Sequence, residues 1–136
     1  MVRNSRLLLG ATASLFLAPA GSATAGSAAA PDVAVLCASP EPAICAALAG
    51  AIKIRAKDRT VTVVPGETPA KGLLSVRFVE EARRRDLLSG HLAWVDPQGR
   101  TGTGPSLEFS VMDGDLGQAR LDDFVLQLLA VSQLPL

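Results

Sequence analysis

The sequence predicts an α+β protein: a two-layer sandwich in which a mostly antiparallel sheet of four or five strands carries two helices on one face. Two segments, one early and one at the C-terminus, space their apolar residues like one face of a helix. The segments between them alternate apolar and polar residues, as strands do. Because helices and sheet each have one apolar side, stacking them buries all of it, in the order β-α-β-β-β-β-α.

The first residues have the pattern of a secretory signal peptide. Arg3 and Arg6 are followed by an apolar run over 7–18 and then by small residues only. The run is too short for the ~20 residues that a membrane span needs. We therefore predict a signal peptide over 1–25, cleaved after Ala25, with 28–30 as the second choice for cleavage.

The predicted mature protein consists of a flexible leader over 26–31 and a single domain over 32–136, in the periplasm or secreted. Cleavage after Ala25 leaves 111 of the 136 residues, with 11 basic and 13 acidic side chains. One modest core fits this length. The charge does not indicate a nucleic-acid partner, because the only basic cluster, 83–85, lies between acidic residues.

The domain is expected to begin with a buried strand over 32–38 and a helix that follows it directly. Ser39 can cap this helix, with Pro40 at the first helical position, where a missing N–H is harmless. The helix should run to about Arg55, with an apolar stripe made by Ile44, Cys45, Leu48 and Ile52. A second short strand over 59–65 favours a right-handed parallel crossover, and an antiparallel arrangement stays open.

Three further strands show the two-residue alternation typical of antiparallel strands with one buried face. Their apolar positions are Leu74, Val76 and Phe78; Leu92 and Trp94; and Leu107, Phe109 and Val111. Their opposite positions are Ser75 and Arg77; His91 and Ala93; and Ser106, Glu108 and Ser110. A hairpin turn is expected at 80–86. A glycine-rich loop is expected at 96–105: it opens with a type I turn, and its part over 99–105 is expected to be flexible.

A second helix is predicted from Leu116 to about Gln133. Asp115 can cap it, and Gln118 can reach back in the manner of a capping box. Its apolar stripe is formed by Leu121, Phe124, Val125 and Leu128.

The two cysteines, Cys37 and Cys45, end the first strand and lie on the inward face of the first helix. In an oxidising compartment an even count favours a structural disulfide. Two unpaired buried thiols, or a redox or metal pair, stay open as alternatives. A redox pair usually has a two-residue spacer, whereas seven residues separate these two. A zinc site would need further ligands, and the only histidine, His91, is distant in sequence.

The sequence offers no catalytic constellation. His91 lies on a polar strand face beside Arg77 and Glu108, but no serine motif of the G-x-S-x-G type accompanies it. The segment 99–105 resembles a phosphate loop only in its glycines, since it lacks the lysine and leads into a strand. We therefore expect no catalytic residue, no metal and no cofactor.

The order of elements, and above all the hairpin and closing helix over 87–129, resembles a class of small periplasmic α/β docking modules. The amino-terminal domain of the Tol-system β-propeller protein and the activators of penicillin-binding proteins belong to this class. In these modules another helix commonly precedes the hairpin, and the segment 65–72 is too short for a full one. The resemblance implies a protein-binding role without catalytic residues.

These observations lead us to expect an exported, non-catalytic accessory protein that binds another envelope protein. The contact would be made by the polar sheet face, with Arg77, His91, Glu108 and Ser110, or by an exposed strand edge. The alternative is a small-ligand-binding periplasmic protein whose pocket lies between the sheet and the loop over 96–105.

Overall fold

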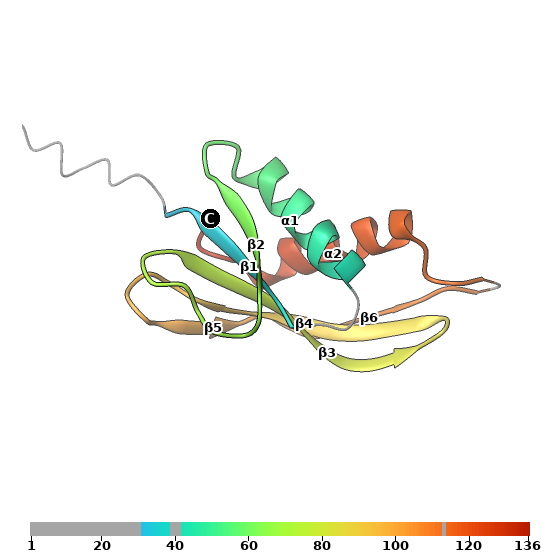
Figure 1. Ribbon diagram of the computed structural model, residues 1–136. Coiled ribbons are helices and arrows are strands. Elements are labelled where there is room, and N and C mark those ends of the chain that lie inside the picture. The colour runs from blue at the N-terminus through green and yellow to red at the C-terminus, as the bar shows by residue number, and fades with distance from the viewer. Residues whose placement is uncertain (1–30, 39–41, 113) are drawn as a thin grey trace, which may run out of the picture.

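The computed structural model describes residues 31–38, 42–112 and 114–136 (Figure 1). The predicted signal peptide and almost all of the leader lie outside the described residues, as do Ser39 and Pro40, the expected start of the first helix. In the described part of the chain, no helix is long and apolar enough to cross a membrane.

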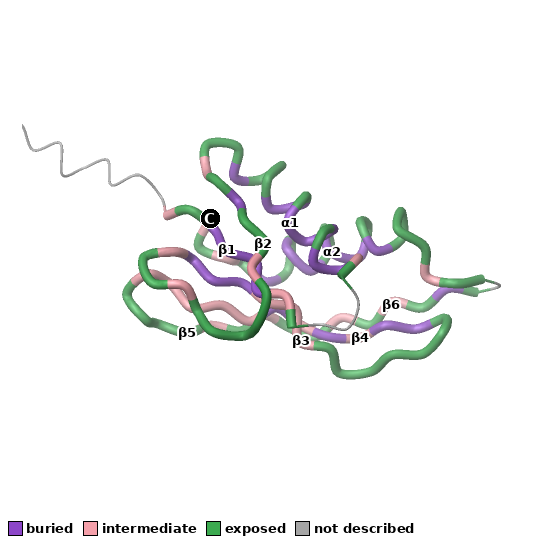
Figure 2. Tube along the Cα trace, in the orientation of Figure 1, coloured by how far each residue is buried: buried purple, intermediate pink, exposed green. Residues whose placement is uncertain are grey.

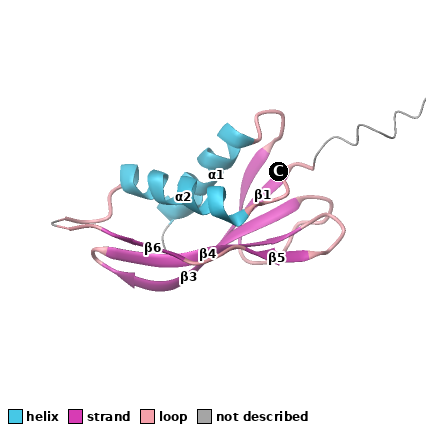
Figure 3. Cartoon of the chain, turned by 180° about the vertical axis from the view of Figure 1, so that it is seen from behind, coloured by secondary structure: helices cyan, strands magenta, loops and turns pink. Residues whose placement is uncertain are grey.

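The chain forms two helices and a six-stranded sheet, which confirms the α+β class. In chain order the elements are β1 (Val33–Cys37), α1 (Pro42–Arg55), β2 (Val61–Pro65), β3 (Leu74–Arg84), β4 (Leu87–Val95), β5 (Thr101–Thr103), β6 (Leu107–Ser110) and α2 (Gln118–Ser132). Both helices lie on the same side of the sheet, as the view from behind shows (Figure 3).

The sheet is mixed, so the prediction of a mostly antiparallel sheet was wrong. Its order is β2-β1-β3-β4, with β5 and β6 both paired to the far edge of β4. β1 is parallel to β2, as a crossover through α1 favours, and is also parallel to β3, whereas β3 and β4, β4 and β5, and β4 and β6 pair antiparallel. The first four residues of β1 are all buried, which fits a central strand covered on both faces. The alternation within β3 does not reveal a parallel neighbour on its other edge.

The core lies between the sheet and the helices, where the predicted apolar rows meet (Figure 2). Leu74, Val76 and Leu92 are fully buried. The Phe124 ring of α2 meets Phe78 edge-on at 5.9 Å between centroids and Phe109 at 5.7 Å. Trp94 packs against the edge of this core, as its place in the apolar row predicts. The predicted stripes of both helices are likewise buried.

Cys37 and Cys45 form a disulfide, with their Cα atoms 5.8 Å apart. The structure therefore selects the disulfide from the alternatives that the sequence leaves open. The bond joins the end of β1 to the first turns of α1, and closing so short a loop contributes about 2–3 kcal/mol in the chain-entropy model.

The β3–β4 hairpin is longer than predicted. The segment 80–86 was expected to be a turn, but β3 continues to Arg84, and only Arg85 and Asp86 form the turn. The strand contains a bulge, because Glu80 pairs with Gly90 while Ala82 pairs with the next residue, Ser89. Glu81 is the extra residue. Charged side chains are tolerated here because residues 80–84 of β3 are all exposed.

The start of α2 also differs from the prediction. The helix begins at Gln118 after Gly117, which caps it with an extended backbone and no side-chain hydrogen bond. Asp115 does not cap the helix; its Oδ1 lies 2.5 Å from Nε of Arg85, in the hairpin turn. Gln118 does not reach back either, since its Nε2 donates to Asp122 at 3.1 Å. The exposed ion pair thus uses the carboxylate that the capping box would require.

Candidate functional site

The side of the sheet that faces away from the helices carries all four residues predicted as a site. Arg77 belongs to β3, His91 to β4, and Glu108 and Ser110 to β6. Each alternates with a residue of the core row, and Glu108 pairs directly with Ser89 on the neighbouring strand. We call this side the outer face.

A three-residue hydrogen-bonded cluster organises the outer face. The Oε1 atom of Glu81 lies 2.7 Å from Nδ1 of His91 and 2.5 Å from Oγ of Ser106. Since a carboxylate only accepts hydrogen bonds, both the imidazole Nδ1 and the serine hydroxyl donate to it. A neutral His91 therefore carries its proton on Nδ1 and leaves Nε2 as an acceptor. We call these three residues the Glu81 cluster.

The surroundings of Glu81 favour its charged form. The hydrogen bond from Ser106, and then the hydrogen bond from His91, lower the pKa of the Glu81 carboxyl from its ordinary value. The carboxylate is well exposed, so this effect acts through direct donors and not through burial. The cluster consequently keeps a fixed negative charge beside His91 at neutral pH.

The hydrogen bonds of the Glu81 cluster differ from those of a catalytic triad and instead connect neighbouring strands. In a triad the serine donates to the histidine, which acts as its base, and the carboxylate orients the histidine from behind. Here Ser106 and His91 donate to the same carboxylate oxygen, so the histidine takes no proton from the serine. The cluster ties the β3 bulge and the start of β6 to β4, which lies between them.

The sequence suggested Arg77 and Glu108 as neighbours of His91, but the side chain that bonds His91 is that of Glu81. Arg77 approaches Glu67 instead, with Nη1 and Oε1 4.0 Å apart. Glu108 and Ser110 have no side-chain hydrogen bond or ion pair within the described residues. The sequence analysis missed Glu81 because it placed this residue in a turn. The bulge that turns Glu81 toward His91 cannot be recognised from the alternation of apolar and polar residues in the sequence.

Part of the outer face is covered by the connection from β2 to β3, residues 66–73. This segment passes the sheet on the side away from the helices (Figure 1). The Ala70 N–H donates to Oγ of Ser75 at 2.9 Å, and Ser75 is only 1% exposed although the sequence predicted a polar, solvated position. Ala34 and Leu36 of β1 are buried as well, and Leu36 lies beside Glu67 and Pro69 of this connection.

A small cavity of about 170 Å³ remains between this connection, β3, β4 and β5. Leu36, Ala93 and Val95 contribute apolar atoms to it, and Arg77, Thr101 and Thr103 contribute polar groups. Since Thr101 and Thr103 belong to 96–105, the predicted ligand-binding region does border a cavity. A second hollow, a groove of about 300 Å³ between the helices, is lined by Ala46, Gly50, Ile54, Gln118, Asp122 and Leu126.

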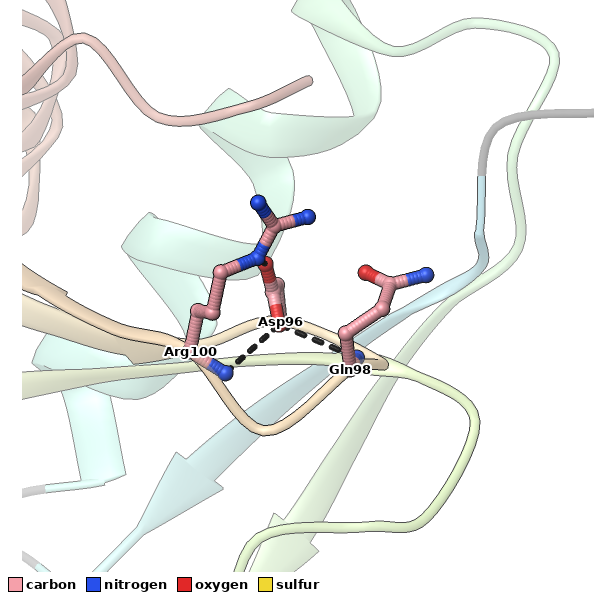
Figure 4. A network of polar contacts seen from close by, with 3 residues as sticks. All are labelled: Asp96, Gln98 and Arg100. Atoms are coloured by element: carbon pink, nitrogen blue, oxygen red, sulfur yellow. Dashed lines mark hydrogen bonds and ion pairs between the residues drawn. The ribbon is translucent and has the colours of Figure 1, made fainter.

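The segment 99–105 was expected to be a flexible loop, and the structure corrects this, because 101–103 form the strand β5 after a turn at 96–99. Asp96 holds a tight turn (Figure 4): its Oδ1 accepts from the backbone N–H groups of Gln98 at 3.0 Å and Arg100 at 2.8 Å, and its Oδ2 lies 3.1 Å from Nε of Arg100. Gly99 donates to the Asp96 carbonyl, which closes the predicted four-residue turn. The chain then forms β5 against β4, where Gly102 leaves room for the indole of Trp94.

Among the described residues there is no group of three or more histidine, cysteine or acidic side chains that could hold a metal ion. No family model matches this chain. No curated protein matches it either.

Proposed function

We propose that this protein is an exported, non-catalytic accessory protein that binds another cell-envelope protein through the open part of its outer face. The observation that carries the proposal is the Glu81 cluster, which fixes polar groups on a sheet surface that neither helix covers. Glu108 and Ser110 lie on β6 beside it. Groups already fixed in place lose little freedom on binding, which favours association.

Two further observations support this function. The disulfide between Cys37 and Cys45 suits an oxidising compartment, as does the signal-like N-terminal sequence. Binding is favoured over catalysis because the hydroxyl of Ser106 is turned to a carboxylate and not to the imidazole. The ring of His91 and the carboxylate of Glu108 offer hydrogen-bonding groups to a partner.

Reversing charges on the outer face tests this proposal. The double variant Arg77→Glu, Glu108→Arg should abolish capture of the partner from envelope extracts, because like charges then meet across the interface. Its melting temperature should stay close to that of the wild type, since Glu108 is exposed, the half-buried Arg77 makes only a long ion pair with Glu67, and substitutions at surface positions change stability by about 0.5 kcal/mol or less. The control is Asp123→Arg, a reversal on an exposed position of α2. Full capture by the double variant would exclude the outer face.

A second candidate function is binding of a small molecule in the cavity between 66–73 and β5. The observation that favours it is the guanidinium of Arg77 beside an apolar floor, which suits a small ligand that carries a carboxylate. A thermal-shift screen of small carboxylates tests it. A ligand at 100 times its Kd adds about 2.7 kcal/mol to the unfolding free energy.

The matched variants for this screen are Arg77→Ala and Glu108→Arg. A ligand in the cavity should lose its stabilising effect on Arg77→Ala and keep it on Glu108→Arg, because Glu108 does not line the cavity. Stabilisation that survives Arg77→Ala would place the ligand elsewhere, and no shift with any carboxylate would leave the protein-binding proposal as the better one.

A further inference from the structure

We propose that two copies of this chain pair through β2, edge to edge and antiparallel, so that their sheets join into one with Val63 at the centre of the seam. This surface lies at the opposite edge of the sheet from β6 and is separate from the proposed outer-face site. The inference goes beyond the proposed function and does not depend on it.

The backbone of β2 has a free hydrogen-bonding edge. Val33 N–H donates to the carbonyl of Thr60 at 2.9 Å, and Gly66 N–H donates to the carbonyl of Cys37 at 3.1 Å. In a parallel ladder alternate residues face the same neighbour, so Thr62 and Val64 also point their backbone groups toward β1. Val61, Val63 and Pro65 therefore point theirs away from the sheet. Among the described residues, no other strand pairs with this edge.

Compared with the other free edges, β2 has little protection against strand pairing. Charges, bulges, prolines and short length normally protect such edges, and β2 has only Pro65, at its end. The outer part of β3 has both, with Glu80, Glu81 and a run of arginines. β6 is short and contains Glu108, and β5 has three residues. β2 has no charged residue, and Val63 is 46% exposed at its middle.

An antiparallel copy fits this edge in one register. With Val63 opposite Val63, each valine donates its N–H to the carbonyl of the other, and the two exposed side chains pack together. Each Val61 N–H then meets the carbonyl of Pro65 in the other copy. Pro65, which has no N–H, falls at the end of the seam, where a missing donor does least harm.

The charges on either side of β2 favour a second copy in this orientation. Arg59 precedes the strand and Glu67 follows it, at equal sequence distance from Val63. Antiparallel pairing brings the Arg59 end of β2 in one copy to the Glu67 end of β2 in the other, whereas parallel pairing would bring like-charged ends together. Both are free to re-pair, because Arg59 reaches the Pro135 carbonyl only at 3.5 Å and Glu67 reaches Arg77 only at 4.0 Å.

Sedimentation of the mature protein over roughly 5 to 500 µM tests the proposal. The wild type should show a reversible dimer. Val63→Lys should sediment as a folded monomer, because it places two lysines against each other at the seam. The matched control is Val131→Lys on α2, where the valine is 41% exposed, and it should still dimerise. A wild type that stays monomeric throughout the range, or a Val63→Lys dimer of unchanged Kd, would overturn the proposal.

A charge swap keeps the proposal testable if Val63→Lys fails to fold. Arg59→Glu and Glu67→Arg should each raise the dimer Kd about fivefold. The double variant, which restores opposite charges across the seam, should return the Kd to near the wild-type value. Two single effects that simply add in the double variant would contradict the antiparallel register. Glu108→Arg should leave the Kd unchanged, which separates this test from that of the outer face.

Discussion

At the scale of single residues, Glu81 fixes the positions of two polar side chains on the outer face. One carboxylate oxygen accepts hydrogen bonds from side chains on two other segments, so it fixes the positions of His91 and Ser106 together. This dual contact is also why the pKa of Glu81 is lowered. The same two hydrogen bonds therefore both position the side chains of the proposed site and favour its negative charge.

The lowered pKa of Glu81 predicts how stability depends on acid. A carboxyl with a lower pKa in the folded state stabilises the fold above its unfolded pKa, about 4.3, and loses that contribution as the pH falls through the folded pKa. The stability difference between wild type and Glu81→Gln should therefore be constant above about pH 5 and shrink below about pH 4. Urea unfolding of both proteins at a series of pH values across this range measures the difference in their free energies of unfolding.

Ser106→Ala serves as the companion variant, because the hydrogen bond from Ser106 is the largest cause of the lowered pKa. Its difference from the wild type should shrink over the same acidic range. If the Glu81→Gln difference stays constant through that range, then the hydrogen bonds to Glu81 do not hold its charged form.

At the scale of elements, β5 shows how a short strand is fixed in place. It has three residues, and its docking on β4 depends on close contact between Gly102 and the indole of Trp94. The turn held by Asp96 sets the direction from which it arrives. The cavity beneath 66–73 takes part of its wall from this strand, so its shape depends on the same contact.

A methyl group at Gly102 would overlap the Trp94 ring, whereas one at Gly50, in the middle of α1, would meet open space. Gly102→Ala should therefore lower the unfolding free energy by about 1–3 kcal/mol. Gly50→Ala should raise it by up to about 1 kcal/mol, because alanine is the better helix former. Denaturant unfolding compares the two variants, and an unchanged Gly102→Ala protein would show that Trp94 does not hold β5.

At the scale of the whole molecule, the sequence predicted the class and the layers because apolar spacing records which side of an element is buried. The rows of Leu74, Leu92 and Phe109, and the helix stripe around Phe124, all lie where they were expected. Strand order was harder to predict. The alternation of β3 predicted antiparallel pairing, but it reports which face of a strand is buried and not which strands lie at its two edges, so the parallel pairing of β1 with β3 was missed.

The candidate site was predicted only in part, for a similar physical reason. Alternation correctly placed Arg77, His91, Glu108 and Ser110 on one side of the sheet. It gave no information on how side chains pair across that side, which depends on the bulge at Glu81 and on the path of 66–73. The contacts of His91 and the burial of Ser75 are tertiary effects of this kind.

The measurement that tests the proposed outer-face function most directly is site-specific photo-crosslinking in the producing cell. A photoreactive residue at Ser110, on the outer face, should give one discrete adduct with another envelope protein. The same residue at Asp123, an exposed position of α2, should not give that adduct. Equal adducts from both positions, or an adduct from Asp123 alone, would contradict the assignment of partner binding to the outer face.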